Sequence, residues 1–496
     1  MGSIEKIHEM LVSKECSCTE LTKSYLDEIE KTNGELNAYV NVTGEEALKT
    51  AEAVDRKIAS GEKIGMLEGV PMTLKDNIST KGIETTCCSK ILTGYKPIYN
   101  ATVWETLAGE NAVMLGKTNM DEFAMGSSCE TSYFGGAMNP FDSNYVSGGS
   151  SGGVASAVGA NIAAYGLGSD TGGSIRQPAS FCGIVGLKPT YGAVSRYGLI
   201  AYASSLDQIG PITKSVEDAA IVFDAISKRD EKDSTSKGFV GDTYSKLNND
   251  IKGMKIGIAK EYLEGVRDDV KEAVLKAADI YKSMGAEIVY FDLPENGAEI
   301  IDIKLPVLQQ ALPVYYIIAC AEASSNLGRY DGIRFGYKTE HYNGTHDMVC
   351  RTRSEGFGEE VKRRILLGTY VLSAGYYDAY YKKAQNLRGT IVKAFNNAFE
   401  KCDVILAPTV PMTAFEKGHA VSDPIETYLT DICTVPVNIA GLPGVSVPCG
   451  FNAKGMPIGM QLIGKSFGEA EILNAAYKYQ QAAAENFKDT KWGVKL

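Results

Sequence analysis

Two glycine-rich segments that carry serine residues constrain this chain more than any other feature of its sequence. They read SGGSSGG at 147–153 and GSDTGGSIRQP at 168–178. Glycine lets the backbone adopt positive φ and approach a ligand closely, and consecutive N–H groups in such a turn form a site for negative charge. An oxyanion hole has this requirement, because its donors must point at an oxygen that becomes charged in the transition state. The pattern therefore predicts a nucleophilic serine, Ser174, within its own oxyanion hole.

A serine nucleophile needs a base, and histidine is the usual one. The chain has four histidines, and none lies near the glycine-rich segments: His8, His341, His346 and His419. The segment EHYNGTHD, which contains His341 and His346, is polar and predicts a surface loop. Histidine is therefore not the predicted base.

Lysine is the alternative partner for a serine nucleophile, and Lys75 in GVPMTLKDNI (69–78) is the candidate. Val70, Met72 and Leu74 alternate with polar positions, which predicts a strand with one buried face that carries Lys75 at its tip. A lysine acts as a base only when it is neutral. Lowering its pKa from about 10.4 to roughly 7 takes about 4–5 kcal/mol of desolvation and hydrogen bonding, so Lys75 must be buried. A solvated surface lysine is the alternative interpretation.

Together, Lys75 in VPMTLKDNI, Ser150 in GGSSGG and Ser174 in GSDTGGSIRQPA resemble the amidase signature family, whose catalytic set is a serine, a cis-serine and a lysine. The spacing makes the resemblance specific, with about 75 residues between Lys75 and Ser150 and 24 between Ser150 and Ser174. It extends over nearly the whole chain. Four further segments are similar to the glutamine-hydrolysing members that serve tRNA-dependent amidotransferases: KTNMDEFAMGSS (117–128), GLKPTYGAVSRYGLIAYASSLDQIGP (186–211), EGFGEEVKRRILLGTY (355–370) and TVPVNIAGLPGVSVPCG (434–450).

The resemblance implies a role for each residue of the set. Ser174 would attack the side-chain amide of glutamine, and Lys75 would be the final base. Ser150 would pass the proton between them, because a hydroxyl both donates and accepts. Departing ammonia would take its proton from the same relay run in reverse, and water would then hydrolyse the glutamyl ester. The oxyanion would be held, without a metal ion, by the backbone N–H groups of Thr171, Gly172, Gly173 and Ser174.

Free glutamine carries an α-carboxylate and an α-ammonium group, so its site needs one cation and one anion. By resemblance the cation is Arg364 in EVKRRI, with Arg363 as the alternative, and the anion is Asp431 in YLTDICTVP. An arginine fork matches a carboxylate better than a lysine does. The other interpretation is that Arg364 and Asp431 are ordinary charges on helix surfaces.

Two further positions are expected to line the glutamine pocket. Either Tyr315 or Tyr316 in LPVYYII would contact the substrate, and so would Ser127 in AMGSSCETS. Ser127 departs from the family pattern, which commonly has a second glycine there. The backbone around the substrate is therefore expected to differ locally.

The resemblance implies a single large α/β domain with a central mixed sheet covered by helices on both faces. The expected boundaries are an N-terminal helical segment at 1–60, packed on an amidase signature domain at 61–485. The local patterns agree with this order of elements. They predict two N-terminal helices: Ser17 and Glu20 cap the first, which Gly34 ends, and Gly61 ends the second. They also predict a mobile exposed loop at 227–238. A strand at 255–260, a helix at 267–283 and strands at 286–293 and 403–409 are expected to follow.

Composition limits the partners of this chain. Its net charge of −11 argues against a direct grip on nucleic acid, whose phosphates are bound by lysine and arginine patches. No run of eighteen apolar residues appears, and the eleven cysteines lack metal-ligand spacing, which favours a cytoplasmic protein with free thiols. No cofactor is expected in this chain. By resemblance, a large tRNA-binding kinase/transferase subunit would bind ATP, Mg²⁺ and mischarged tRNA, and a small third subunit would complete the heterotrimer.

Three functions remain open from the sequence. The first is a glutaminase that supplies ammonia for converting Glu-tRNA(Gln) to Gln-tRNA(Gln), Asp-tRNA(Asn) to Asn-tRNA(Asn), or both. The second is a free-standing amidase acting on a small acyl amide, for which the charged pair Arg364 and Asp431 would have nothing to bind. The third, a scaffold without catalysis, is disfavoured because all three catalytic residues are present.

Overall fold

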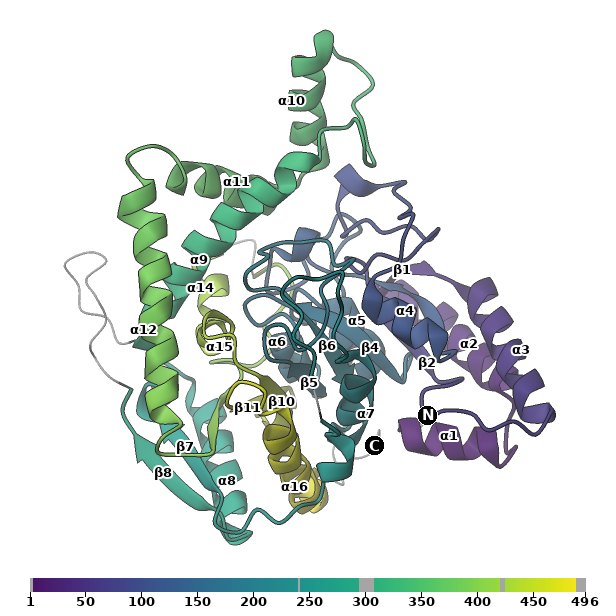
Figure 1. The fold of residues 1–496 in the computed structure, drawn as a ribbon, viewed down its shortest axis with the longest axis vertical. Helices are drawn as coiled ribbons and strands as arrows, with labels where there is room; N and C mark the ends of the chain where they lie inside the picture. The colour runs from purple at the N-terminus through teal and green to yellow at the C-terminus, as the bar shows by residue number, and fades with distance from the viewer. Residues whose placement is uncertain (1–2, 240, 294–306, 420–423, 488–496) are drawn as a thin grey trace.

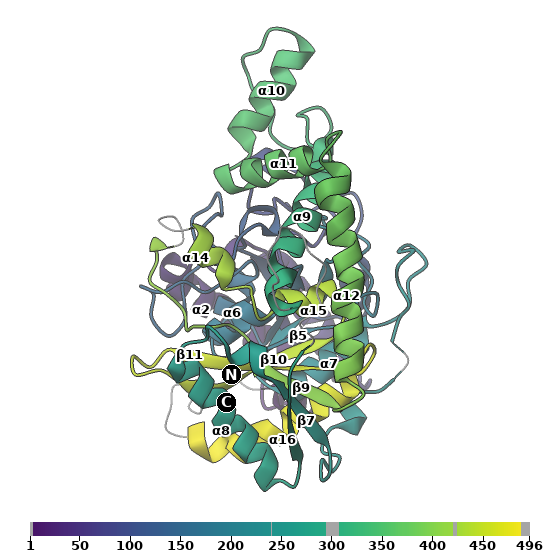
Figure 2. The same ribbon diagram turned by 90° about the vertical axis from the view of Figure 1, so that its left-hand side faces the viewer.

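One mixed sheet forms the centre of the molecule (Figures 1 and 2). The computed structural model describes residues 3–239, 241–293, 307–419 and 424–487. In these ranges the sheet has eleven strands in the order β1-β3-β2-β4-β6-β5-β10-β11-β9-β7-β8. The strands are β1 (Tyr39–Val42), β2 (Pro71–Lys75), β3 (Val113–Thr118), β4 (Tyr165–Asp170), β5 (Val185–Lys188), β6 (Gln208–Thr213), β7 (Lys255–Ala259), β8 (Glu287–Phe291), β9 (Val404–Pro408), β10 (Gly444–Phe451) and β11 (Pro457–Ile463).

This sheet combines parallel and antiparallel strand pairs. Strand β2 runs parallel to β3 and β4, and β7 runs parallel to β8 and β9. The remaining pairs, including β4 with β6 and β10 with β11, are antiparallel. The predicted mixed α/β sheet and the strands predicted at 255–260, 286–293 and 403–409 are therefore confirmed.

Helices follow or connect most of these strands. They are α1 (Ile4–Val12), α2 (Cys18–Leu36), α3 (Gly44–Ala59), α4 (Thr102–Gly109), α5 (Gly152–Gly159), α6 (Arg176–Phe181), α7 (Val216–Ile226), α8 (Asp268–Ser283), α9 (Val307–Asn326), α10 (Gly344–Gly356), α11 (Glu359–Val371), α12 (Lys383–Ala398), α14 (Pro424–Leu429), α15 (Val435–Ile439) and α16 (Glu469–Phe487). Helix α16 contacts both α7 and α8, and all three helices contact the sheet; α5 and α6 form a second group against it.

Both faces of the sheet are covered by packed side chains. Along β9, Val404 and Leu406 belong to one buried cluster, whereas Ile405 and Ala407 belong to another. Because successive side chains of a strand point to opposite faces, each face of the sheet has its own core. All five residues of β2 are buried as well, so the expectation of a single buried face on this strand was wrong.

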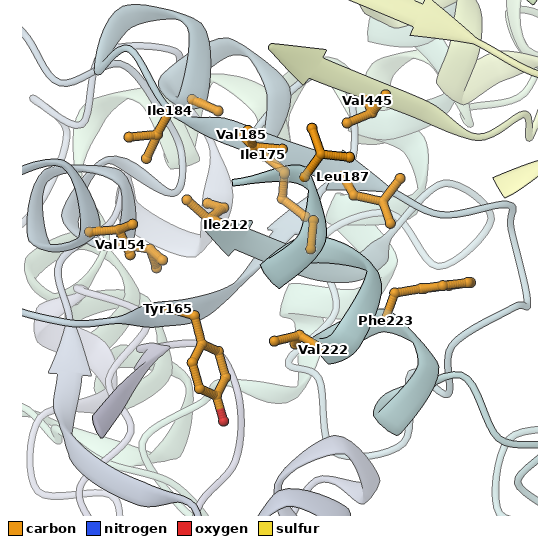
Figure 3. Close-up of a cluster of buried hydrophobic side chains, with 14 of the residues drawn as sticks. Val154, Tyr165, Ile175, Ile184, Val185, Leu187, Ile212, Val222, Phe223 and Val445 are labelled. Atoms are coloured by element: carbon orange, nitrogen blue, oxygen red, sulfur yellow. The ribbon is translucent and has the colours of Figure 1, made fainter. Parts of the chain in front are cut away.

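The apolar core anchors both glycine-rich segments. Val154 in α5 and Ile175, which follows Ser174, lie in the same buried cluster as Ile212 of β6 (Figure 3). Both side chains are completely buried. The serine-bearing turns are therefore fixed by tightly packed neighbours on the same segments.

The helix signals near the N-terminus are largely confirmed. Ser17 and Glu20 form the predicted capping box at the start of α2. Gly34 does not end this helix, which continues to Leu36 and is followed by Asn37 at φ 47°. Asparagine tolerates this left-handed conformation because its short polar side chain bonds locally, so it can replace glycine in ending a helix. The second helix, α3, ends at Ala59, before Gly61, as expected.

One of the two loop predictions was wrong in part, and the other is confirmed in its lack of secondary structure. Residues 344–356, which include His346, form helix α10, which projects from the body of the molecule (Figure 1). The segment 227–238 contains no helix or strand, but its side chains tether it. Asp230 accepts hydrogen bonds from the hydroxyls of Thr102 (2.5 Å) and Ser195 (2.6 Å), which are far away in the sequence. Composition identified a polar loop but could not show that its carboxylates are bound.

Candidate active site

Lys75 lies at the end of β2 in a completely buried position. Its Nζ atom is 2.7 Å from the Oγ of Ser150 and 2.9 Å from the Oγ of Ser151. Burial lowers the pKa of Lys75 to about 8, although nearby carboxyl groups act in the opposite direction. The alternative of a solvated surface lysine is therefore excluded, and the neutral form of Lys75 is more accessible near neutral pH than that of an ordinary lysine.

Parallel strand pairing brings Lys75 to these serines. Strands β2 and β4 run side by side, with Leu74 opposite Leu167, so their carboxyl ends lie at the same edge of the sheet. Ser169 of β4 consequently lies beside Lys75, with its carbonyl oxygen 3.2 Å and its Oγ 3.0 Å from Nζ. Ser169 and Ser151 contact Lys75 directly, and neither was predicted as a site residue.

The two glycine-rich segments meet at this point. The peptide bond between Gly149 and Ser150 is cis, and the N–H of Ser151 donates to the carbonyl oxygen of Ser174 (3.1 Å). Ser150 is completely buried, whereas Ser174 is 8% exposed. Ser174 is thus the member of the predicted set that lies nearest to solvent, with Ser150 and Lys75 behind it.

The turn that carries Ser174 presents unpaired backbone donors. Among the described residues, the N–H groups of Gly172, Gly173 and Ser174 have no hydrogen-bond acceptor. Gly173 has a φ of 147°, and a Cβ at this position would lie 2.3 Å from the Oγ1 of Thr434. Glycine is therefore required here by both conformation and space. Three consecutive free N–H groups provide the donors that an oxyanion hole needs.

A buried ion pair, which the sequence analysis did not identify, fixes this turn. The Nε of Arg176 donates to the carboxylate of Asp170 (3.1 Å), and both side chains are fully buried. Asp170 also accepts from the N–H of Ile175 (3.2 Å). Although burial opposes its ionisation, Arg176 holds the pKa of Asp170 below its usual range. The pair holds both ends of the turn around Ser174 in place. The sequence indicates it only through an Asp and an Arg that flank TGGSI.

Gln177 links the nucleophile region to the predicted substrate pocket. Its Oε1 accepts from the N–H of Gly149 (2.9 Å), and its Nε2 donates to the carbonyl oxygen of Ser127 (2.7 Å). Ser127 in turn donates through its hydroxyl to Asp431 (2.8 Å). The structure therefore joins Ser127 directly to the predicted anion. A glycine at position 127 would lack this hydroxyl.

Asp431 lies beside the oxyanion turn. The hydroxyl of Thr434 contacts the carbonyl oxygens of both Gly172 (2.6 Å) and Asp431 (3.1 Å). Burial raises the pKa of Asp431 to about 7, while the hydrogen bond from Ser127 and the charge of Arg364 oppose the shift. Asp431 is 7% exposed, so it is not an ordinary surface charge.

Arg364 is likewise buried, at 3% exposure. Its Nε donates to Glu360 (2.7 Å) and its Nη1 donates to the hydroxyl of Tyr202 (2.6 Å). Rings of three tyrosines face the guanidinium group: Tyr202, Tyr316 and Tyr428. The side chain of Arg363 is instead 47% exposed. Burial thus distinguishes these adjacent arginines, which the sequence could not.

Both candidate tyrosines belong to the site, at different places. A Cβ on Gly172 would lie 2.7 Å from the ring of Tyr315, so this ring packs directly against the oxyanion turn. Tyr316 faces Arg364, and its ring centroid lies 4.7 Å from that of Tyr428. Tyr315 therefore borders the reacting end of the site, and Tyr316 borders its cationic end.

A cavity of about 230 Å³ opens next to these residues. Its lining includes the predicted Ser127 and both candidate arginines, Arg363 and Arg364. It also includes four carboxyl groups that the sequence analysis did not identify: Glu122, Glu130, Glu359 and Glu360. Burial raises the pKa of Glu122 to about 7. The cavity therefore contains both carboxyl groups and arginines, and Glu360 forms ion pairs with Arg363 and Arg364.

The described part of the chain contains no group of three or more His, Cys, Asp or Glu side chains placed to hold a metal ion. None of the eleven cysteines forms a disulfide bond. None of the helices in the described ranges is long and apolar enough to cross a membrane.

This chain is similar to proteins of a known family over most of its length. The family model described as Amidase matches residues 20–473. The A subunit of glutamyl-tRNA(Gln) amidotransferase from Thermoanaerobacter pseudethanolicus is 55% identical, over 98% of this chain and 97% of that protein. The protein of the same name from Caldanaerobacter subterraneus subsp. tengcongensis is also 55% identical, over 97% of this chain and 96% of that protein.

Solved structures agree with these sequence relatives. The crystal structure of the A subunit of glutamyl-tRNA(Gln) amidotransferase from Thermotoga maritima superposes with a TM-score of 0.79 at 40% identity, covering 99% of this chain and 95% of that one. A bacterial aryl acylamidase of the amidase signature family gives a TM-score of 0.86 at 25% identity, covering 99% and 98%. Enzymes whose names state different substrates therefore share this backbone. Of these relatives, the amidotransferase proteins have the higher sequence identity to this chain.

Proposed function

Because this chain belongs to the amidase family, we propose that its site hydrolyses glutamine and that the chain is the glutaminase subunit of a tRNA-dependent amidotransferase. The observation that carries the proposal is the buried contact between Lys75 and Ser150 behind a turn with three free N–H groups at Ser174. This arrangement supplies a base, a relay and oxyanion donors around one hydroxyl. The 55% identity to proteins named as the A subunit of glutamyl-tRNA(Gln) amidotransferase supports the choice of substrate.

In the proposed reaction, each of these groups has one role. The Oγ of Ser174 attacks the side-chain amide carbon of glutamine, while its proton passes to Ser150 and the proton of Ser150 passes to Lys75. The N–H groups of residues 172–174 hold the oxyanion, with the N–H of Thr171 as the fourth predicted donor. Collapse of the tetrahedral intermediate breaks the carbon–nitrogen bond, and the relay returns a proton to the departing ammonia. Water then hydrolyses the ester and releases glutamate.

The charged groups at the pocket favour glutamine over an uncharged acyl amide. The Nε and Nη1 of Arg364 are bound to Glu360 and Tyr202, which leaves the Nη2 end for a substrate carboxylate. Asp431, already oriented by Ser127, is the partner for the α-ammonium group. An aryl or alkyl amide would leave both buried charges without a ligand, which costs binding energy. The free-standing amidase is therefore the weaker alternative.

The pH dependence of glutamine hydrolysis should reflect both titrating groups. Lys75 acts as a base only when neutral, and this fraction grows as pH rises through its pKa of about 8. Asp431 must be ionised to bind the ammonium group, and its pKa is about 7. We expect kcat/KM to rise from about pH 6 to about pH 9 as these groups lose their protons. Measuring ammonium release across this range checks the expectation, and a profile that is flat or falling above neutral pH would contradict the base role of Lys75.

The amidation step requires partner subunits. The segment GMQLIGKS at 459–466 matches the G-x-x-x-x-G-K-[ST] pattern, but residues 459–463 belong to strand β11 and so do not form a phosphate-binding loop. The net charge of the chain is −11. We assign ATP, Mg²⁺ and the mischarged tRNA to a large tRNA-binding kinase/transferase subunit, accompanied by a small third subunit, all in the cytoplasm. Ammonia released into water would be diluted and protonated, so the assembly should contain a shielded path from Ser174 to the partner's site. Whether Glu-tRNA(Gln), Asp-tRNA(Asn) or both are amidated is decided by the tRNA-binding subunit and the available synthetases.

An amidation assay with two nitrogen donors tests this division of labour. The assembled complex carrying Ser174→Ala should fail to convert Glu-tRNA to Gln-tRNA with glutamine and ATP. It should succeed when ammonium salts replace glutamine, because the partner's site is intact. Co-purification of the wild-type chain with a large tRNA-binding subunit and a small third subunit is the matching structural test. Equal failure with both donors in a normally assembled mutant, or tRNA amidation by this chain alone, would contradict the proposal.

A further inference from the structure

The side-chain amide of Gln177 lies between the two halves of the site. Gln177 is completely buried in the first turn of α6, three residues after Ser174, and its own N–H donates to the carbonyl oxygen of Gly173 (2.8 Å). Its Oε1 accepts from the N–H of Gly149, beside the relay serine, and its Nε2 donates to the carbonyl oxygen of Ser127 in the substrate pocket. One side chain therefore contacts both the relay segment and the wall of the pocket.

The two partners determine which end of this amide is the oxygen. A backbone N–H can only donate and a backbone carbonyl oxygen can only accept. Gln177 must therefore present its oxygen to Gly149 and its nitrogen to Ser127. An aliphatic side chain at position 177 would leave both backbone groups without this partner at a buried position, which is unfavourable.

The Ser127 segment depends on this amide. Among the described residues, Gln177 supplies the only hydrogen bond to the backbone of residues 126–128. These three residues line the cavity of the site. From this segment the hydroxyl of Ser127 donates to Asp431 (2.8 Å). The position of the hydroxyl that orients Asp431 therefore depends on the amide of Gln177.

We propose that Gln177 is a positioning residue for substrate selection: its amide holds the Ser127 segment so that the Ser127 hydroxyl keeps Asp431 aligned with the α-ammonium group of glutamine. The inference rests on the proposed function, in which Asp431 binds this group. Gln177 acts through the backbone of Ser127 and not by touching the substrate. Because it also follows the nucleophile directly in the chain, the same short segment serves both hydrolysis and the choice of substrate.

The two ends of the amide should have different effects on the reaction. Loss of the bond to Gly149 disturbs the segment that carries Ser150 and slows every substrate alike. Loss of the bond to Ser127 acts on Asp431 and affects only a substrate with an α-ammonium group. Two substrates that differ in this group alone separate these effects: glutamine, and glutaramate, which has the same carboxylate and side-chain amide but no α-amino group.

The test measures ammonium release from both substrates by the wild type, Gln177→Met, Ser127→Ala and the double variant. The quantity compared is the ratio of kcat/KM for glutamine to kcat/KM for glutaramate, in which any loss common to both substrates cancels. We expect this ratio to fall about tenfold in Ser127→Ala, which loses a hydrogen bond to a charged group, and about fivefold in Gln177→Met, which weakens it. The double variant should match Ser127→Ala, because Gln177 then has no route to Asp431.

Gln480 provides a matched control. It is a buried glutamine of α16 whose amide also accepts from a backbone N–H, that of Val216 (3.0 Å), and donates to a second oxygen, on Glu217 (2.9 Å). This bridge joins α16 to α7, and neither helix carries a residue of the site. Gln480→Met should leave the ratio unchanged. Thermal unfolding identifies the folded variants. If Gln177→Met does not fold, Gln177→Asn, whose amide is one methylene closer to the backbone, should lower the ratio in the same direction.

Three outcomes separate failure of this inference from failure of the proposed function. Equal losses with both substrates and an unchanged ratio in the Gln177 variants would overturn the inference, because the residue would then serve only the catalytic turn. A further fall of the ratio when Gln177→Met is added to Ser127→Ala would overturn the path through the Ser127 hydroxyl. A wild-type protein that releases no ammonium from glutamine, or does not prefer glutamine to glutaramate, would instead contradict the proposed function.

Discussion

Replacing Ser174 with alanine is expected to reduce glutamine hydrolysis by about 10³-fold or more, which corresponds to about 4 kcal/mol of transition-state stabilisation. The variant removes the only oxygen that forms the ester, while the turn remains fixed by Asp170 and Arg176. Folding should be unaffected, because the lost hydroxyl leaves little cavity at a position that is 8% exposed. Ammonium release measures the rate, and the unfolding temperature measures the fold.

A matched serine controls for the loss of a hydroxyl. Ser156 is buried in α5, and its Oγ has no partner among the described residues. Ser156→Ala should therefore retain activity close to that of the wild type. Ser150→Ala should be severely impaired, because the relay is broken. If Ser174→Ala kept more than a few per cent of the wild-type rate, or if a covalent adduct formed on Ser150, the two serine roles would have to be reassigned.

Replacing Lys75 with arginine is expected to inactivate the enzyme as completely as replacing it with alanine. Arginine keeps the positive charge but does not lose its proton in a protein, so it cannot serve as the base. An electrostatic role for Lys75 predicts the opposite result, with substantial activity retained. Glutamine hydrolysis by Lys75→Arg, Lys75→Met and Lys75→Ala distinguishes the two roles.

The buried position of Lys75 requires a folding control for these variants. Arginine is bulkier than lysine, and its guanidinium group would meet Ser150, Ser151 and Ser169 in a site without exposed surface. Lys75→Met removes the charge at similar volume and should remain folded. Thermal unfolding and circular dichroism identify the folded variants. Activity in a folded Lys75→Met protein would exclude a lysine base irrespective of how arginine is accommodated.

Much of the site could be predicted because its signals are local in the chain. A turn with free backbone donors is predicted by Ser174, its neighbouring glycines and the SGGSSGG segment. The structure shows this turn at residues 172–174. The capping box of Ser17 and Glu20 is equally local. Such signals depend on residues a few positions apart, so a sequence states them directly. The same reasoning failed at Gly34 and at 344–356. At these places the residue type or the surrounding packing permits a conformation other than the predicted one.

Short segments of the chain were enough to identify the chemical groups of the site: the two serine-bearing turns, a lysine at the end of a strand, and pairs of adjacent candidates such as Arg363 and Arg364. The folded structure was needed to show that Lys75 is desolvated, that Arg364 is the buried arginine, and that Ser127 bonds to Asp431. The partners in each case lie far apart in the chain, as with Ser127 and Asp431 or Asp170 and Asn438. Loss of water around a charge depends on every element packed against it, and this packing is a property of the folded chain that no short segment records.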